Sequence, residues 1–181
     1  MKSLITLIAA AGFAAPVMPQ PAPETPKACV QLRVSFGFTV HASYAKTAPL
    51  FGPNGERAWA GEDWDPKFIY PQPADDQEGA VFTVSHGTHN IVWVNTLFDV
   101  EARHFQYVYF LPEIMVATVD VRFKSIDADT TQVNVVYTRT ALTPEANEHV
   151  AKMSDGDKNK DREWQQAIDA YLARTNFGQQ Q

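Results

Sequence analysis

Alternation of apolar and polar side chains is the clearest pattern in the chain, and it begins near residue 30. A period of two residues is typical of a strand that buries one face. We therefore predict a long first strand over residues 30–41. Its apolar positions are Val30, Leu32, Val34, Phe36, Phe38 and Val40, with polar or small residues between them.

Two short helices are predicted after this strand. Ser43 can cap a helix over residues 44–51, which Pro49 would interrupt. Residues 52–55 read Gly-Pro-Asn-Gly and are expected to form a turn. A second helical stretch is expected over residues 56–60.

The next part of the chain is rich in β-branched and aromatic residues, which favour strands. Turn residues separate these segments at short intervals, so we predict an antiparallel meander. The expected strands cover residues 67–70, 80–85, 90–97, 104–111, 115–124 and 132–138.

A long amphipathic helix is predicted at the end of the chain. Thr143 can cap its start, Pro144 suits the first helical position and Glu145 complements the helix dipole. Met153 and Trp164 are 11 residues apart, a spacing that returns to within about 20° of the same helix face. Two apolar stripes therefore share one face if the helix is continuous: Ala146, Val150 and Met153, then Trp164, Ile168 and Tyr171.

The middle of this helix, residues 154–161, is polar and contains Gly156, a residue that weakens helices. It is expected to be a break, a frayed turn or a solvated stretch. No helices alternate with the strands, which excludes a doubly wound α/β fold. We predict an α+β fold, in which a curved antiparallel sheet of about seven strands is covered on its concave face by the long helix.

The first residues have the features of a signal peptide. Lys2 precedes an uncharged apolar run over residues 4–15, and small residues near Ala14 and Ala15 suit signal peptidase. The run is shorter than the roughly 20 residues that span a bilayer. We expect export to the periplasm or secretion, with no stable membrane anchor after cleavage. An uncleaved anchor or a buried first helix are the alternatives.

Residues 16–27 contain five prolines and are expected to form an extended linker. The predicted folded domain covers residues 28–176, and residues 177–181 are expected to be a flexible tail. The single cysteine, Cys29, cannot form an internal disulfide. We interpret it as a small residue at the start of the first strand.

Composition limits the class of partner. Hydrophobic residues make up 45% and aromatic residues 12%, which excludes a mainly disordered chain. The formal net charge is -6. An anionic protein repels nucleic acid and anionic membrane surfaces, so we expect no nucleic-acid partner.

Three stretches of sequence resemble the START-like, or SRPBCC, superfamily, which includes Bet v 1-like, polyketide cyclase-like and Hsp90-activator-like proteins. They are residues 56–59 (ERAW) with 64–71 (WDPKFIYP), residues 135–147 (VVYTRTALTPEAN), and Glu163-Trp164 leading into residues 168–172. The resemblance covers residues 30–173. The polar middle of the last helix departs from the superfamily pattern.

This resemblance implies a helix-grip fold, which closes a curved sheet over a long helix around an apolar cavity. It also implies that Trp59, Trp64 and Tyr70 lie at the cavity entrance, where aromatic side chains can hold an apolar ligand. The alternative is that these side chains fill the end of the barrel as core. The superfamily contains lipid carriers, hormone receptors, cyclases and hydrolases, so the fold does not define the activity.

The inner face of the predicted sheet supplies further candidates. Buried tyrosines and an asparagine need hydrogen-bond partners, and a ligand can provide them. An inward arginine can pair with a ligand carboxylate or phosphate, unless the strand ends first and leaves the arginine in solvent. The candidate cavity residues on these strands are Trp93, Asn95, Phe105, Tyr107, Tyr109, Tyr137 and Arg139.

Metal binding is not favoured by the sequence. His86 and His89 could meet through a turn, joined by His104 or His41, but we interpret them as surface residues. The acidic run from residue 155 to 161 lacks the glycine and the final glutamate of a calcium loop. We expect no metal and no cofactor.

Three functions remain open at this point. The first is an exported protein that binds a hydrophobic small molecule or lipid in its cavity. The second is an enzyme of the cyclase or hydrolase type that uses polar cavity residues such as Arg139, Tyr107 or His89. The third is a protein-interaction module with a filled barrel. The sequence does not define the oligomeric state.

Overall fold

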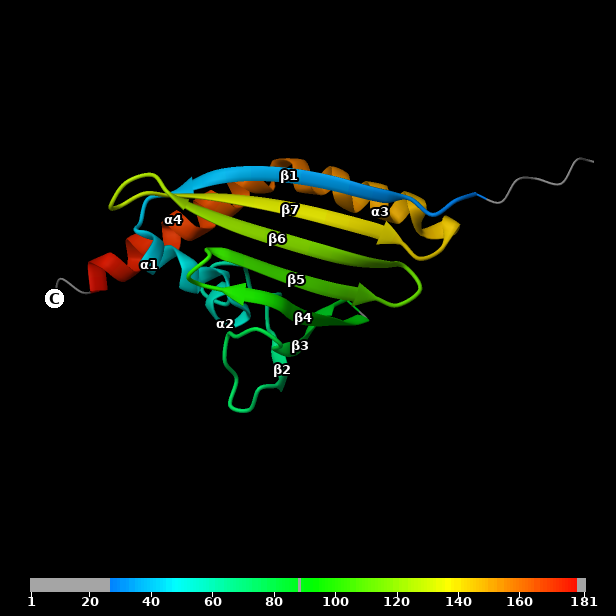
Figure 1. Cartoon of the computed structure of the whole chain (residues 1–181), viewed down its shortest axis with the longest axis horizontal. Helices are drawn as coiled ribbons and strands as arrows, with labels where there is room; N and C mark the ends of the chain where they lie inside the picture. Colours follow the sequence, from blue (N-terminus) through cyan, green and yellow to red (C-terminus); the bar gives the residue numbers. More distant parts are fainter. Residues whose placement is uncertain (1–26, 88, 179–181) are drawn as a thin grey trace, which may run out of the picture.

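The computed structural model describes residues 27–87 and 89–178. The expected signal peptide and nearly all of the expected linker therefore lie outside the described residues. Seven strands, β1 to β7, form one sheet (Figure 1). They are β1 (Gln31–Val40), β2 (Lys67–Tyr70), β3 (Val81–His86), β4 (His89–Asp99), β5 (His104–Leu111), β6 (Met115–Ser125) and β7 (Thr131–Ala141).

The sheet has the order β1-β7-β6-β5-β4-β3-β2, and every neighbouring pair is antiparallel. Strands β2 to β7 form the expected meander, and β1 pairs with the last strand, β7. This pairing places the first strand beside the last one: Phe36 lies opposite Val135. The predicted strand positions are confirmed with shifts of a few residues at their ends.

Two short helical segments follow β1, as predicted, but the second lies earlier than expected. The first is α1 (Tyr44–Thr47), continued by the 3-10 turn η1 (Ala48–Phe51), and the second is α2 (Pro53–Glu56). Residues 53–55 of the predicted turn are therefore helical, and Gly52 is the N-cap. Asp76 accepts hydrogen bonds from the backbone N–H groups of Asn54 and Gly55 at 2.9 and 3.3 Å, and such side-chain acceptors stabilise a helix start.

The C-terminal helix is interrupted. After η2 (Pro144–Ala146) come α3 (Asn147–Gly156), the 3-10 turn η3 (Asp157–Asn159) and α4 (Lys160–Gly178), which extends into the expected tail. Thr143 caps the start as predicted, since its hydroxyl accepts from the N–H of Ala146. Within the polar middle, residues 157–159 form the tight turn η3. The solvated interpretation is wrong for Asp157, whose side chain is buried.

Helices α3 and α4 run along one face of the sheet, beside β1 and β7 (Figure 1). We call this the inner face and the opposite one the outer face. Residues of β5, β6 and β7 alternate between the two faces as the sequence pattern predicts. The inner-face core includes Phe51, Phe105, Val121, Val135 and Ile168, all fully buried.

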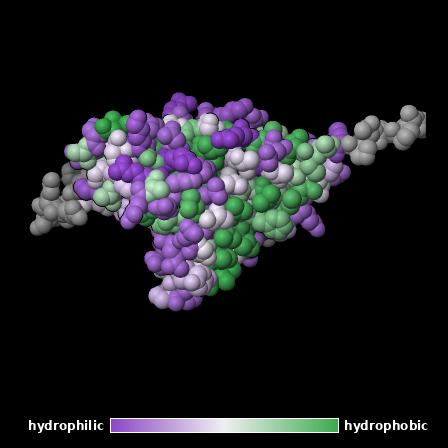
Figure 2. Space-filling model, in the orientation of Figure 1, coloured by the Kyte–Doolittle hydropathy of each residue, from purple (hydrophilic) through white to green (hydrophobic). Residues whose placement is uncertain are grey.

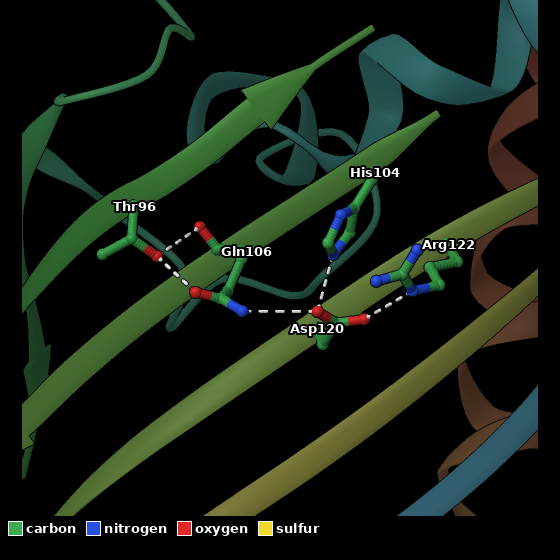
Figure 3. A network of polar contacts seen from close by, with 5 residues as sticks. All are labelled: Thr96, His104, Gln106, Asp120 and Arg122. Carbon is green, nitrogen blue, oxygen red and sulfur yellow. Dashed lines mark hydrogen bonds and ion pairs between the residues drawn. The ribbon is translucent and has the colours of Figure 1, made fainter. Parts of the chain in front are cut away.

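The outer face is turned toward the viewer in Figure 2 and carries both apolar and polar side chains. Val92 and Phe110, which are opposite each other on β4 and β5, are exposed. On the same face, side chains of β4, β5 and β6 form a polar network centred on Asp120 (Figure 3). His104 Nε2 lies 2.6 Å from one oxygen of this carboxylate, and Arg122 Nε lies 3.2 Å from the other.

Candidate ligand-binding cavity

A cavity of about 340 Å³ lies between the inner face of the sheet and the C-terminal helices. Strands β3, β4, β5 and β7 form one wall, and α3, η3 and α4 form the other. The chain contains four tryptophans, and all of them line this cavity: Trp59, Trp64, Trp93 and Trp164. Aromatic rings therefore form a large part of the cavity wall.

Backbone hydrogen bonds hold two of these tryptophans in place. The indole N–H of Trp59 donates to the Leu50 carbonyl at 2.6 Å, and that of Trp64 donates to the Pro53 carbonyl at 3.0 Å. Both acceptors belong to the short helical segments after β1. The rings of Trp59 and Trp164 meet edge to face, with centroids 5.2 Å apart. The short helical segments thus hold the rings of Trp59 and Trp64 in position at the cavity wall.

A second, much smaller cavity of about 20 Å³ lies next to the first. Trp64, Trp93, Tyr137 and Trp164 line both, so this inner chamber is a continuation of the larger cavity. Its remaining walls come from α2, η1 and the middle of the sheet, and include Glu56, Phe51, Phe82 and Tyr107. A volume of this size holds about one water-sized group.

The charged groups of the larger cavity are paired with each other. Arg139 donates to both oxygens of Asp157, and its Nε donates to the Tyr109 hydroxyl at 3.1 Å. The side chains of Arg139 and Asp157 are only 4% and 8% exposed. At the mouth, Lys160 and Glu163 pair at 2.7 Å. No cation here lacks a protein counter-charge, so Arg139 is not free to bind a ligand carboxylate.

Glu56 is different from these paired groups. Its carboxyl faces the inner chamber, and burial, reinforced by the nearby charge of Asp76, raises its pKa well above the usual range. Within the described part of the chain, neither a cation nor a hydrogen-bond donor acts on this pKa. An ionised carboxylate without a partner is costly in an apolar site, so the surroundings of Glu56 favour its neutral form.

Two tyrosines share this environment. Burial is the main cause that raises the pKa of both Tyr107 and Tyr137 well above that of a free tyrosine. The Tyr107 hydroxyl donates to the Phe51 carbonyl, which ties β5 to η1. Only burial and charges affect the pKa of Tyr137, and no hydrogen bond does. Both phenols therefore remain protonated at neutral pH.

The structure separates the predicted site residues into two groups. Trp59, Trp64, Trp93, Tyr109, Tyr137 and Arg139 line the larger cavity, and Tyr107 lines the inner chamber. The predicted inward position of Arg139 is confirmed, because β7 continues to Ala141. Whether these residues bind a ligand stays a prediction.

Three predicted positions lie away from the cavity. Tyr70 is 56% exposed, because it ends the edge strand β2. Asn95 is buried near a bulge in β4, where its amide donates to the Gln77 carbonyl at 3.1 Å. Phe105 stacks on Phe98 at 4.1 Å and belongs to the core. It borders a separate groove of about 450 Å³ beside α1 and η1.

The histidines are dispersed, and one of them, His86, also borders the larger cavity. His86 and His89 lie opposite each other at the β3–β4 turn, and His104 is on the outer face. Across residues 27–87 and 89–178, no three His, Cys, Asp or Glu side chains come close enough to hold a metal ion. None of the helices described there is long and apolar enough to cross a membrane.

Sequence reasoning missed two residues of the site. Glu56 opens the stretch that resembles the START-like superfamily, but a glutamate in a short helix is normally exposed. Asp157 was interpreted as part of a solvated acidic run. Its pairing with Arg139 depends on the placement of η3 over β7, which no local pattern encodes.

Comparison with known proteins identifies the fold. No protein-family model matches the chain, and no curated protein matches its sequence. Among solved structures, norcoclaurine synthase from Thalictrum flavum in complex with dopamine and hydroxybenzaldehyde has a TM-score of 0.61 at 13% identity. The match covers 81% of this chain and 88% of that one.

Two further structures agree with this assignment. A protein from Arthrobacter aurescens has a TM-score of 0.57 at 19% identity, over 79% of this chain and 87% of that one. Ara h 8.0201 has a TM-score of 0.54 at 14% identity, and the match covers 80% of this chain and 99% of that one. The chain therefore has the Bet v 1-like helix-grip fold, which confirms the predicted fold class. Identities this low show the fold alone.

Proposed function

We propose that this protein binds a hydrophobic small molecule with one or two aromatic rings in the cavity between its sheet and its C-terminal helices. The main support is the lining of the cavity by all four tryptophans together with Tyr109 and Tyr137. Flat aromatic walls favour a flat apolar ligand, which gains from stacking and edge contacts.

The size of the cavity supports a small ligand. Small-molecule sites usually enclose about 300–1,000 Å³, and the value of about 340 Å³ lies at the lower end of that range. We therefore favour a ring compound over a long-chain lipid. Norcoclaurine synthase, which shares the fold, was solved with two single-ring compounds bound. A cavity of this volume also counts against the filled-barrel alternative.

The proposal can be tested by blocking the cavity without touching its polar groups. Ala167 lines the cavity on α4, and Ala170 is exposed on the same helix. We expect Ala167→Phe to weaken the binding of ethylnaphthalene at least about tenfold, because the added ring occupies the ligand's space. Ala170→Phe should leave the affinity within about twofold.

Isothermal titration calorimetry with purified protein gives the affinities, and circular dichroism confirms that both variants are folded. Tryptophan emission provides a second readout, because every tryptophan borders the cavity. Equal binding by the two variants would place the ligand elsewhere. Absence of any binding by the unmodified protein to ethylnaphthalene, naphthol and indole would contradict the proposal itself.

We also propose that the protein acts outside the cytoplasm. The support is the sequence of residues 1–15 alone: a basic start, an apolar run and small residues at its end. Mass spectrometry of the protein recovered from its native host should show a chain that has lost these residues. A full-length chain in the cytoplasmic fraction would contradict export.

A further inference from the structure

One side chain that lines the inner chamber carries a buried hydrogen-bond donor without an acceptor. The indole N–H of Trp93 is buried and has no partner, unlike those of Trp59 and Trp64. A buried donor without an acceptor costs about 1–3 kcal/mol, so folded proteins rarely retain one without a role. Trp93 lines both the larger cavity and the chamber, at the point where they meet.

Two more potential donors line the same chamber. Tyr137 comes from β7, and no hydrogen bond of its hydroxyl contributes to its pKa. Glu56 comes from α2, and its carboxyl has no cation beside it. An aromatic enclosure favours the protonated form of such a carboxyl, and a protonated carboxyl can donate a hydrogen bond. Three separate elements, α2, β4 and β7, therefore bring residues that can donate to the walls of one small space.

We propose that the inner chamber binds the carbonyl oxygen of the ligand, and that the ligands of this protein are aromatic ketones and aldehydes. Trp93, Tyr137 and Glu56 are the specificity-determining donors. This inference rests on the proposed function, since the aromatic part of the ligand would occupy the larger cavity. A carbonyl oxygen needs only the space of about one water-sized group, and the chamber has about 20 Å³.

The charge of the site argues for a neutral ligand. Arg139 is neutralised by Asp157, and Lys160 by Glu163. An aromatic amine is the main competing ligand, because its cation could pair with an ionised Glu56 and rest on the tryptophan rings. That arrangement would leave the Trp93 N–H without an acceptor. A carbonyl oxygen, with two lone pairs, can accept from Trp93 and from a second donor.

Matched ligands test the inference. Acetylnaphthalene, ethylnaphthalene and naphthylmethylamine share one ring system and differ in the group that would enter the chamber. We expect acetylnaphthalene to bind the full-length protein at least about tenfold more tightly than ethylnaphthalene by calorimetry, because each satisfied donor contributes to affinity. Naphthylmethylamine should bind more weakly than both.

Variants of the chamber residues show which side chains cause the preference for acetylnaphthalene over ethylnaphthalene. Tyr137→Phe and Glu56→Leu should each reduce the preference for acetylnaphthalene about fivefold, with little effect on ethylnaphthalene. Glu56→Gln keeps an N–H donor at the same place and should lose less than Glu56→Leu. Tyr70→Phe, at an exposed position, is the matched control.

The outcomes separate this inference from the proposed function. Equal binding of acetylnaphthalene and ethylnaphthalene would overturn carbonyl recognition while leaving the aromatic cavity intact. Tightest binding by the amine, lost in Glu56→Gln, would overturn it in favour of a carboxylate–ammonium site. Failure of all three compounds to bind would contradict both proposals. If Tyr137→Phe or Glu56→Leu is misfolded by circular dichroism, the ligand series on the unmodified protein still decides.

Discussion

Glu56 on the inner side of the sheet and Asp120 on the outer face are both carboxyl groups partly removed from solvent, but their neighbours differ. Glu56 faces aromatic rings, and its pKa is raised well above the usual range by burial and by Asp76. Burial also acts to raise the pKa of Asp120. There the contacts with His104, Gln106 and Arg122 outweigh it and lower the pKa (Figure 3).

Asp157 shows that the inner side can also hold an ionised carboxylate. Its partner is Arg139, which is itself buried and also bonded to Tyr109. The comparison teaches that burial alone does not determine the charge of these groups. A cation or donor within reach does, because the interior amplifies both the cost of an unpaired charge and the strength of a paired one.

The largest expected effect is at the buried pair. Asp157→Ala should lower the free energy of unfolding by about 3–5 kcal/mol, because it leaves the Arg139 guanidinium buried without a counter-charge. Asp155→Ala is the matched control: its carboxylate is 70% exposed and pairs only with Lys158. That change should cost less than about 1 kcal/mol. Urea denaturation gives both values.

A double variant sharpens this prediction. Replacing the pair by apolar residues, Arg139→Met with Asp157→Leu, should restore most of the lost stability, because no charge remains to be desolvated. A double variant as unstable as Asp157→Ala would mean that the pair matters for packing rather than for charge balance. Equal losses of unfolding free energy in Asp155→Ala and Asp157→Ala would contradict the burial of the Arg139–Asp157 pair.

The next effect is the pH dependence at Glu56, measured without ligand. A raised pKa means that the folded state binds a proton that the unfolded state releases above about pH 4.3. Stability from this group is thus complete below that pH and is lost as the pH rises toward the folded pKa. Glu56→Gln has no group to ionise at this position, so it does not lose stability in this way. Its free energy of unfolding, relative to that of the unmodified protein, should rise by about 1.4 kcal/mol per pH unit between the unfolded and the folded pKa.

Urea denaturation between pH 4 and 8 checks this dependence. Glu78→Gln, at an exposed position in the loop before β3, serves as the control and should show a constant difference from the unmodified protein. Parallel stability curves for Glu56→Gln and the unmodified protein would contradict a raised pKa.

Much of the fold could be predicted from the sequence, because it depends on local patterns. The alternation from Val30 to Val40 and the stripes around Met153 and Trp164 gave the correct strand and the correct helix face. The helix at Pro53 was missed because its N–H groups are capped by Asp76, which lies more than twenty residues further along the chain.

The site was less predictable for the same physical reason. Aromatic residues on an inward register, such as Trp93 and Tyr109, could be assigned to a cavity wall from periodicity. The role of a polar residue depends on contacts between distant segments. Asp157 is buried where it pairs with Arg139 of β7. Glu56 borders the inner chamber because α2 lies close to Tyr107 of β5. Neither contact can be predicted from the local sequence pattern.

The smallest expected effect is on the outer face. His104, whose Nε2 donates to Asp120, and its neighbours stabilise the ionised form of that carboxylate. Asp120→Asn should therefore cost about 1 kcal/mol at neutral pH, since the side chain is partly solvated.

A lowered pKa gives the pH dependence at Asp120 the opposite sign to that at Glu56. The contribution of Asp120 is fully present above the unfolded pKa of about 3.9 and disappears as the pH falls through the lower folded value. Urea denaturation should thus show a gap between Asp120→Asn and the unmodified protein that is constant above about pH 5 and closes in acid. A gap that widens in acid would mean that the outer network, like the inner chamber, favours a protonated carboxyl, and the contrast between the two faces would not hold.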